Sequence, residues 1–252
     1  MIKKIINVLS LGIVLIMVVI FFLPKEKAQP ELTAKSQEAK PSSNSVPQEE
    51  ELLKELPKVK KSDWQLLLVN SQHPIKAEGS KLIPMKNSYE IDERVYDAYY
   101  AFEEAALNAG YSLTVLSAYR SIAHQQEVFD NGVAEQLAAG LSQKEAELKT
   151  KEYITVPGTS EHHTGLAVDV VDQEWYNQGR GLEDGFYDTP AGKWIDQNAS
   201  SYGFVIRYPK GKEEITGINY EPWHLRYVGN ESAKFMEKYQ LVLEEYLELL
   251  EK

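Results

Sequence analysis

The stretch that decides the fold reads Ser160-Glu161-His162-His163-Thr164-Gly165-Leu166-Ala167-Val168-Asp169-Val170-Val171, a polar turn with two histidines that leads into an apolar strand. Strand alternation places Asp169 on one face and Val168 and Val170 on the other, yet the neighbours on both faces are apolar. An ionised aspartate buried in such a strand is costly unless a cation or several hydrogen-bond donors meet it. A metal ion is one such cation, and His162 lies upstream on the same turn to share it.

The composition argues against two classes of function. The chain has 252 residues and a formal net charge of −11, and it contains no basic block that could neutralise the phosphates of a nucleic acid. Since it has no cysteine, it has no thiol nucleophile, forms no disulfide and cannot be anchored through a lipidated cysteine.

The first part of the chain differs in composition from the rest. Residues Ile5 to Leu23 are almost all apolar and are closed by Pro24, and a helix of this length spans about 30 Å, enough to cross a bilayer. We expect residues 1–24 to be an uncleaved signal anchor, with a cleaved secretory signal as the alternative. Residues 25–57 are rich in Pro, Ser, Glu, Lys and Gln and predict a disordered linker. One folded domain should then occupy residues 58–252.

Periodicity and capping signals predict a mixture of helices and strands in this domain. We expect a long loop over residues 172–188. The strands are expected over residues 65–69, 113–116, 166–171, 204–208 and 221–227. The helices are expected over residues 92–108, from Ser121 onward, over 143–153, from Thr189-Pro190 to Gly203, and over 232–248.

Three residues form a candidate metal site. Catalytic zinc commonly has three protein ligands from His, Asp or Glu and an open position for water. His162, Asp169 and His224 supply such a set, with His163 left beside it. On spacing alone, a hydrogen-bonded buried aspartate beside two unrelated histidines is the commoner arrangement.

Glu221 and Arg120 are candidates for the chemistry itself. Glu221 could act as general base if Pro222 breaks the strand, so that Glu221 and His224 face one water; otherwise it is a surface carboxylate at a loop end. Arg120 follows a strand and could bind a substrate carboxylate or a developing oxyanion. The alternative for Arg120 is an ordinary ion pair with one of the 38 acidic residues.

Three motifs occur in order, and together they resemble a known family. They are Tyr119-Arg120-Ser121-x-x-x-Gln125, Ser160-x-His162-x-x-Gly165-x-Ala167-x-Asp169, and Glu221-Pro222-Trp223-His224. This pattern, over residues 60–230, is similar to that of the VanY-type D-alanyl-D-alanine carboxypeptidases, which belong to the LAS zinc metallopeptidases.

The resemblance implies both a fold and a set of roles. The fold would be an α+β domain with a small central antiparallel sheet flanked by helices, the LAS or hedgehog-like peptidase architecture. His162, Asp169 and His224 would hold Zn²⁺, Glu221 would be the catalytic base, and Arg120 would polarise the scissile carbonyl. Ser160 and Gln125 would contact the terminal carboxylate or backbone of the substrate.

The expected function is removal of the C-terminal D-Ala from peptidoglycan stem peptides at the outer face of the membrane. We favour an L,D-carboxypeptidase acting on tetrapeptide over a D,D-carboxypeptidase acting on pentapeptide. A peptidoglycan endopeptidase and a non-catalytic cell-wall-binding module are the alternatives. We expect contact with the membrane through the N-terminal helix, no nucleic-acid partner and no obligate protein partner.

Overall fold

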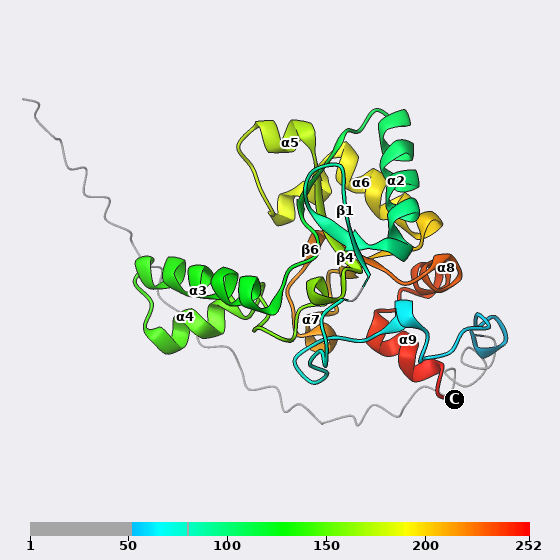
Figure 1. Ribbon diagram of the computed structural model, residues 1–252, viewed down its shortest axis with the longest axis horizontal. Helices are drawn as coiled ribbons and strands as arrows, with labels where there is room; N and C mark the ends of the chain where they lie inside the picture. Colours follow the sequence, from blue (N-terminus) through cyan, green and yellow to red (C-terminus); the bar gives the residue numbers. More distant parts are fainter. Residues whose placement is uncertain (1–51, 80) are drawn as a thin grey trace, which may run out of the picture. The chain divides into compact units, whose positions relative to one another are not determined.

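A four-stranded antiparallel sheet places the candidate ligands on neighbouring strands. The computed structural model describes residues 52–79 and 81–252 (Figure 1). The strands follow the order β3-β4-β6-β5, so the strands that carry Asp169 and His224 are adjacent in the middle of the sheet, with these two residues paired in register. Their bounds are β3 Leu113–Ser117, β4 Ala167–Asp172, β5 Phe204–Tyr208 and β6 Glu221–Tyr227. The predicted α+β class, with a small antiparallel sheet flanked by helices, is confirmed.

One face of this sheet builds the main apolar core. Alternate residues of the strands point to this face and pack with helices α2 (Glu93–Asn108) and α6 (Pro190–Asn198). Figure 1 shows both helices on the same side of the sheet. The fully buried members of this core include Val168, Val170, Phe204, Leu225, Phe102 and Ile195.

The opposite face of the same strands is polar but equally buried. It carries Asp169 of β4, Arg207 of β5, and His224 and Arg226 of β6, each at most 4% exposed. The short 3-10 helix η2 (Glu161–Thr164) and the C-terminal helix α9 (Leu243–Leu249) contribute carboxylates to this face. A second apolar cluster lies beyond it, where Val205 packs with α9 and with α8 (Asn230–Tyr239).

Helices α3 (Ile122–Ala138) and α4 (Gln143–Thr150) form a hairpin beside the sheet (Figure 1). Both begin where the sequence predicts. Ser121 caps α3 by accepting from the His124 N–H, and Ser142 with Glu145 forms a capping box on α4, satisfying N–H groups that a helix start leaves free. The hairpin has its own small core, with Phe129, Val133 and Ala146 buried.

The segments at both ends of the domain depart from the predicted elements. Residues 65–69 do not form the expected strand; the structure has a 3-10 helix, η1 (Trp64–Leu66), followed by irregular chain. The single helix expected over 232–248 is two helices, α8 and α9, because Gln240 adopts a left-handed backbone with φ of 52°.

The expected loop after β4 contains short helices. These are α5 (Gln173–Asn177) and η3 (Asp184–Asp188), and Asp172 starts the first of them by accepting from the Trp175 N–H. The remaining elements are short: strands β1 (Leu82–Pro84) and β2 (Glu90–Asp92), helix α7 (Glu213–Thr216), and η4 (Ala199–Tyr202), which extends α6 to Gly203.

The packed part of the chain begins earlier than the composition predicts. Leu52 and Leu56, inside the range assigned to the linker, pack against the second apolar cluster.

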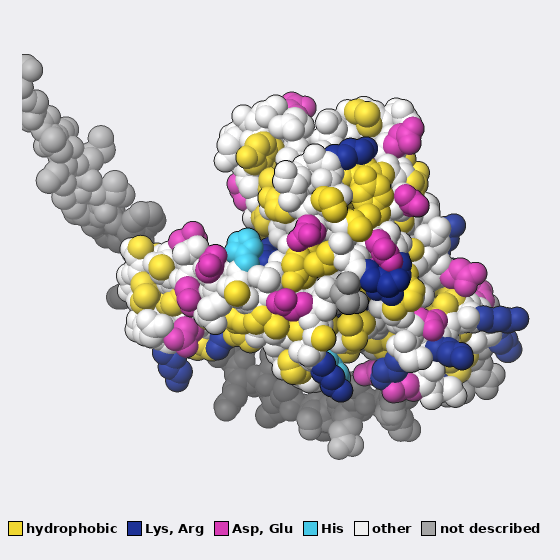
Figure 2. All heavy atoms as spheres, in the orientation of Figure 1, with side chains coloured by type: hydrophobic (Ala, Val, Ile, Leu, Met, Phe, Trp, Pro, Cys, Tyr) yellow, Lys and Arg dark blue, Asp and Glu magenta, His cyan; other side chains and the backbone are white. Residues whose placement is uncertain are grey.

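The predicted membrane span, Ile5 to Leu23, lies outside the described residues. Among residues 52–79 and 81–252 no helix is long and apolar enough to cross a membrane. On the face in Figure 2, acidic, basic and apolar side chains intermingle.

Candidate metal centre and active site

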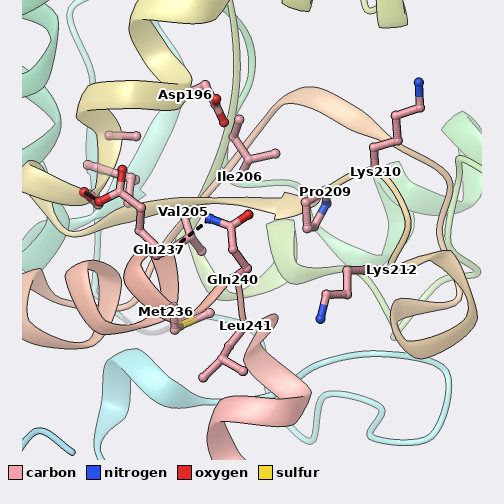
Figure 3. Close-up of a pocket in the computed structure, with 13 residues that line it drawn as sticks. Asp196, Val205, Ile206, Pro209, Lys210, Lys212, Met236, Glu237, Gln240 and Leu241 are labelled. Atoms are coloured by element: carbon pink, nitrogen blue, oxygen red, sulfur yellow. Dashed lines mark hydrogen bonds between the residues drawn. The ribbon is translucent and has the colours of Figure 1, made fainter. Parts of the chain in front are cut away.

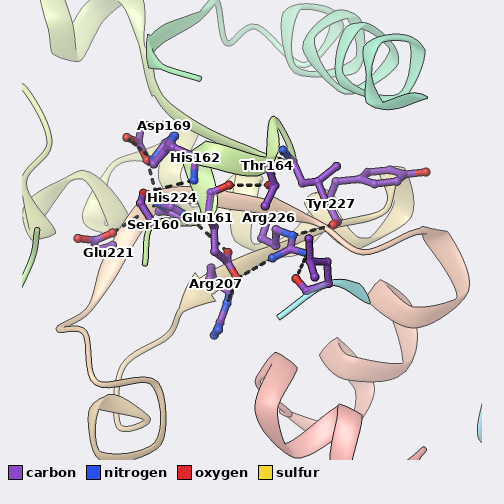
Figure 4. A network of polar contacts seen from close by, with 12 residues as sticks. Ser160, Glu161, His162, Thr164, Asp169, Arg207, Glu221, His224, Arg226 and Tyr227 are labelled. Carbon is purple, nitrogen blue, oxygen red and sulfur yellow. Dashed lines mark hydrogen bonds and ion pairs between the residues drawn. The ribbon is translucent and has the colours of Figure 1, made fainter. Parts of the chain in front are cut away.

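The three candidate ligands converge on one buried point (Figure 4). His162 Nε2 lies 3.2 Å from Asp169 Oδ2, and His224 Nδ1 lies 3.1 Å from Asp169 Oδ1. Two ligands that share a tetrahedral zinc ion at about 2.0–2.1 Å are separated by about 3.3 Å. The spacing therefore suits a zinc-sized ion.

Local structure holds these ligands in place. Ser160 caps η2 by accepting from the His162 N–H, and Gly165 ends η2 with φ of 73°, which turns the chain into β4. This left-handed turn lets His162, before the glycine, and Asp169, after it, face the same point. A β-carbon on Gly165 would lie only 2.9 Å from the backbone nitrogen of Asp92.

The ring nitrogens of the two histidines are oriented for binding. His162 Nδ1 lies 2.7 Å from the carbonyl oxygen of Ala118, and a proton donated there leaves the lone pair of Nε2 free for a metal. In His224 the roles of the nitrogens are reversed. Its Nδ1 faces Asp169, and its Nε2 points toward Glu161, 3.8 Å away.

An unpaired carboxylate oxygen shows that these residues fit a cation. Asp169 Oδ1 is buried and has no hydrogen-bond partner. Buried polar groups without partners are rare in proteins and need an explanation. The short contact between Asp169 Oδ1 and His224 Nδ1 is explained if both atoms point at a common third atom instead of at each other.

The surroundings of the three candidate ligands also set their protonation states. Burial alone would raise the pKa of Asp169, but His162 and His224 hold it well below its usual value. Burial lowers the pKa of His162, which keeps it neutral. Burial would lower the pKa of His224 too, but Asp169 and Glu161 raise it to about 9. A metal would therefore bind an ionised carboxylate and displace a proton from His224.

Glu221 reaches the same point because β6 is irregular. Ile206 pairs with Leu225, but Tyr208 pairs with Glu221, so the register shifts between them. Between these two pairs β6 has more residues than β5, and this irregularity lets Glu221 and His224 face one side although they are three residues apart. Pro222 predicts such an irregularity. Glu221 Oε2 lies 3.6 Å from His224 Nδ1. Burial raises the pKa of Glu221 to about 8, with His224 opposing and Asp169 adding to the rise.

Arg120 lies beside the cluster in a fixed orientation. Its Nη1 donates to Gln125 Oε1 at 2.8 Å and its Nη2 donates to Ser117 Oγ at 2.6 Å. Nη2 also lies 3.8 Å from Asp169 Oδ2. Burial lowers the pKa of Arg120, against the pull of Asp169 and Glu221; the guanidinium still stays charged.

Two residues near the cluster, Gln125 and His163, have partners within the protein. Gln125 is buried, and besides accepting from Arg120 its Nε2 donates to the Thr155 carbonyl at 2.8 Å. In this structure it therefore orients Arg120. His163, set aside by the sequence prediction, lies away from the cluster: its Nδ1 is 2.7 Å from the Arg120 carbonyl, and its Nε2 accepts from the Gly158 N–H.

The cluster opens into a cavity of about 460 Å³. The polar lining includes Ser160 together with Arg120, Glu221 and the three candidate ligands. The rest of the lining is largely apolar and aromatic. It includes Val128, Tyr153, Ile154, Leu182 and Trp223, with Asp184 also among the lining residues. A cavity with few, convergent polar groups among apolar walls is typical of a ligand site.

Comparison with known proteins assigns the chain to a family. Residues 88–230, more than half of the chain and all three motifs, match the model of the family described as VanY, D-alanyl-D-alanine carboxypeptidase. The chain belongs to the VanY family.

Individual members of the VanY family are similar over most of the domain. A D-alanyl-D-alanine carboxypeptidase of Enterococcus faecalis (strain ATCC 700802 / V583) is 39% identical over 186 residues, which is 73% of this chain and 66% of that protein. A structure of a mutant of the vancomycin resistance D,D-pentapeptidase VanY, in complex with Zn(II), is 39% identical with a TM-score of 0.65 and covers 73% of this chain and 99% of the other. The structure of the LD-carboxypeptidase LdcB is 38% identical with a TM-score of 0.62, and it covers 77% of this chain and 92% of the other.

A second pocket on this VanY domain lacks the features of a site. It lies between β5 and α8 (Figure 3) and has a volume of about 130 Å³. Several of its polar side chains are paired within the protein: Glu237 accepts from Ser200 Oγ, Gln240 donates to the Glu237 carbonyl, and Lys212 donates to Glu245. We assign no ligand to it.

Sequence reasoning missed a set of charged residues behind the ligands. Glu161, Arg207 and Arg226 are fully buried, and each arginine forms an ion pair with Glu161 (Figure 4). Glu244 of α9 forms a further ion pair with Arg207. The signal was present, because Arg207 and Arg226 interrupt apolar strands in the same way that Asp169 does.

Proposed function

We propose that this chain is a zinc-dependent carboxypeptidase that releases the C-terminal D-Ala from peptidoglycan stem peptides. The observation that carries the proposal is the convergence of His162, Asp169 and His224 on one buried point, with Glu221 and Arg120 beside it in a single cavity. A bound zinc ion would supply Lewis-acid polarisation of the scissile carbonyl and lower the pKa of a water molecule.

The protein groups then have distinct tasks. Glu221 would take a proton from the attacking water and return it to the leaving amine of D-Ala. The raised pKa of Glu221 suits this exchange, because a group that both takes and returns a proton works best when its pKa lies near the pH of the reaction. A nearby dication would lower the pKa of Glu221. Arg120, held by Ser117 and Gln125, would donate to the carbonyl oxygen as negative charge develops there.

A free C-terminus is the expected substrate end. Arg120 and Ser160 lie on the same wall of the cavity as the metal ligands and would contact the terminal carboxylate or peptide backbone, while Gln125 would contribute mainly through Arg120. A cationic group beside the scissile bond stabilises such a carboxylate, which favours a carboxypeptidase over an endopeptidase. Since none of the residues expected to act as ligand or base is missing, the sequence and the cavity also favour an enzyme over a non-catalytic wall-binding module.

Features of the cavity support L,D- over D,D-specificity. The exposed Asp184 lines both this cavity and a neighbouring hollow of about 620 Å³, which also contains Asp188 and Glu213. In a tetrapeptide the residue before the terminal D-Ala is a long diamino acid, whereas in a pentapeptide it is D-Ala. A carboxylate at the edge of the cavity suits an amine at the end of a long side chain.

Defined stem peptides test this proposal. We expect D-Ala release from tetrapeptide to exceed release from pentapeptide at equal concentration. Release from pentapeptide alone would show a D,D-enzyme and overturn the preference while leaving the carboxypeptidase assignment intact.

The role of Asp184 is tested by Asp184→Asn. Because an exposed ion pair contributes up to about 1 kcal/mol, we expect KM for tetrapeptide to rise up to roughly fivefold, with kcat and zinc content unchanged. Glu183→Gln is the matched control, since Glu183 pairs with Arg180 and does not line the cavity. Equal KM values for the wild type and Asp184→Asn would remove Asp184 from substrate recognition.

The N-terminal sequence suggests where this reaction takes place. We place the enzyme at the outer face of the cell membrane, held by residues 1–24, with secretion after signal cleavage as the alternative. The substrate lies in that compartment. Membrane fractionation of cells that express the full chain would test this, and recovery of the enzyme in the medium would support the alternative.

A further inference from the structure

Glu161 occupies an unusual position behind the candidate metal centre. Its side chain is fully buried, and both neighbouring arginines donate to the same oxygen: Arg207 Nε at 2.8 Å and Arg226 Nη1 at 2.6 Å from Oε1. The other oxygen, Oε2, is buried without a hydrogen bond. It faces His224 Nε2, which is also buried and unpaired, at 3.8 Å (Figure 4).

We propose that Glu161 is a positioning residue that fixes His224 with its proton on Nε2 and its lone pair on Nδ1, directed at the metal. This inference rests on the proposed zinc site. A ligating imidazole usually donates its other N–H to an acceptor, which sets both the tautomer and the ring orientation. Oε2 is the acceptor in line for this bond, and a small movement of the ring would close the gap.

The arginines keep this carboxylate ionised and aimed. Arg207 and Arg226 bind Oε1 and hold the pKa of Glu161 far below its usual value, although burial alone would raise it. Arg226 is held in turn by the backbone, because its Nη2 donates to the carbonyl oxygens of Gln65 and Leu67. These carbonyls belong to the segment that the sequence predicts as a strand.

The C-terminal helix completes the support. Glu244 of α9 accepts two hydrogen bonds from Arg207, at 2.9 Å and 2.6 Å. Helix α9 lies outside residues 88–230, the range of the family match. Through Glu244, Arg207 and Glu161, a helix outside the matched range is linked to the proposed metal ligand His224.

Glu161→Gln tests the role of Glu161 because an amide cannot replace both carboxylate oxygens. If the amide oxygen accepts from the arginines, its NH₂ faces His224 Nε2 and favours a proton on Nδ1, where the metal must bind. If the amide is flipped, its NH₂ meets two arginine donors. Either way, we expect zinc affinity, measured by chelator competition, to fall roughly 10- to 100-fold.

Two further readouts separate positioning from general stability. The absorption spectrum of the Co²⁺-substituted protein reports loss or displacement of a ligand, and we expect it to change in Glu161→Gln. Glu237→Gln is the control: this exposed residue accepts a hydrogen bond from Ser200 Oγ, away from the cluster, and the variant should keep wild-type zinc affinity and the wild-type spectrum. A folded Glu161→Gln protein with wild-type zinc affinity would overturn the proposal.

Glu244→Gln provides a second test that does not touch Glu161, and it decides the matter if Glu161→Gln does not fold. We expect a smaller loss of zinc affinity, roughly threefold to tenfold. Glu245→Gln, which removes the partner of Lys212 on the same helix, should have no effect. Equal affinities of the two variants would contradict the link through α9. A wild-type protein that binds no zinc would instead refute the proposed function.

Discussion

At the scale of single residues, the site is explained by what each buried charge needs. Asp169 is an ionised carboxylate in an apolar strand, and such a group requires a partner. The structure places His162 and His224 within 3.2 Å of it. The same reasoning applies to Arg207 and Arg226, whose charges are satisfied by Glu161 and by backbone carbonyls.

The roles of base and ligand predict different effects of two substitutions. Glu221→Ala should keep zinc and lose turnover by at least 10²- to 10⁴-fold, because it removes only the proton acceptor. His224→Ala should lose both zinc and turnover, because it removes a ligand. Metal analysis and D-Ala release on the same preparations provide the comparison. Wild-type turnover in Glu221→Ala would show that another group is the base.

Zinc affinity should depend on pH in a defined direction. Asp169 and Glu161 raise the pKa of His224 to about 9 in the metal-free protein, so below pH 9 its Nδ1 carries a proton that zinc must displace. Affinity should therefore rise about tenfold per pH unit from pH 7 to pH 9 and level off above it. Competition titrations across this range measure the slope, and a flat profile would mean that His224 is already neutral at pH 7.

At the scale of elements, local signals predict the starts of helices well. Ser121, Ser142 and Thr189 each accept a hydrogen bond from the first turn of the helix that they were expected to cap. The errors occur where tertiary contacts decide. Residues 65–69 have the composition of a strand, but the carbonyl oxygens of Gln65 and Leu67 accept hydrogen bonds from Arg226. No local pattern in the sequence reveals this long-range contact.

The turn at Gly165 should tolerate substitution poorly. Gly165→Ala adds a β-carbon 2.8 Å from Leu82 Cδ2 and 2.9 Å from the Asp92 nitrogen, besides forcing alanine into a backbone of φ 73°. Gly217 has nearly the same φ, 75°, but open space around it. We expect Gly217→Ala to lower the free energy of unfolding by about 1 kcal/mol and Gly165→Ala by roughly 1–3 kcal/mol more.

Denaturant unfolding of both variants checks this expectation. Zinc affinity should fall only in Gly165→Ala, because that turn connects His162 to Asp169. Equal losses of stability in the two variants would show that the space around Gly165 is not limiting.

At the scale of the whole molecule, the sheet separates two environments. One face packs against α2 and α6 in an apolar core, and the other carries the ligands and the charged residues that support them. The motifs in the sequence were enough to predict the fold class and to pick out His162, Asp169, His224 and Glu221, which the structure brings together in one cavity. The support from α9 was not predictable, because Glu244 resembles a surface residue of an amphipathic helix until Arg207 is placed beside it.

The central claim is that residues His162, Asp169 and His224 hold a zinc ion that Glu221 and Arg120 use to release D-Ala. The most direct test measures D-Ala released from defined tetra- and pentapeptides by metal-free protein as zinc is added back. We expect no release without metal, and a rise in release that saturates at one zinc per chain. Release that is equal with and without zinc would contradict it.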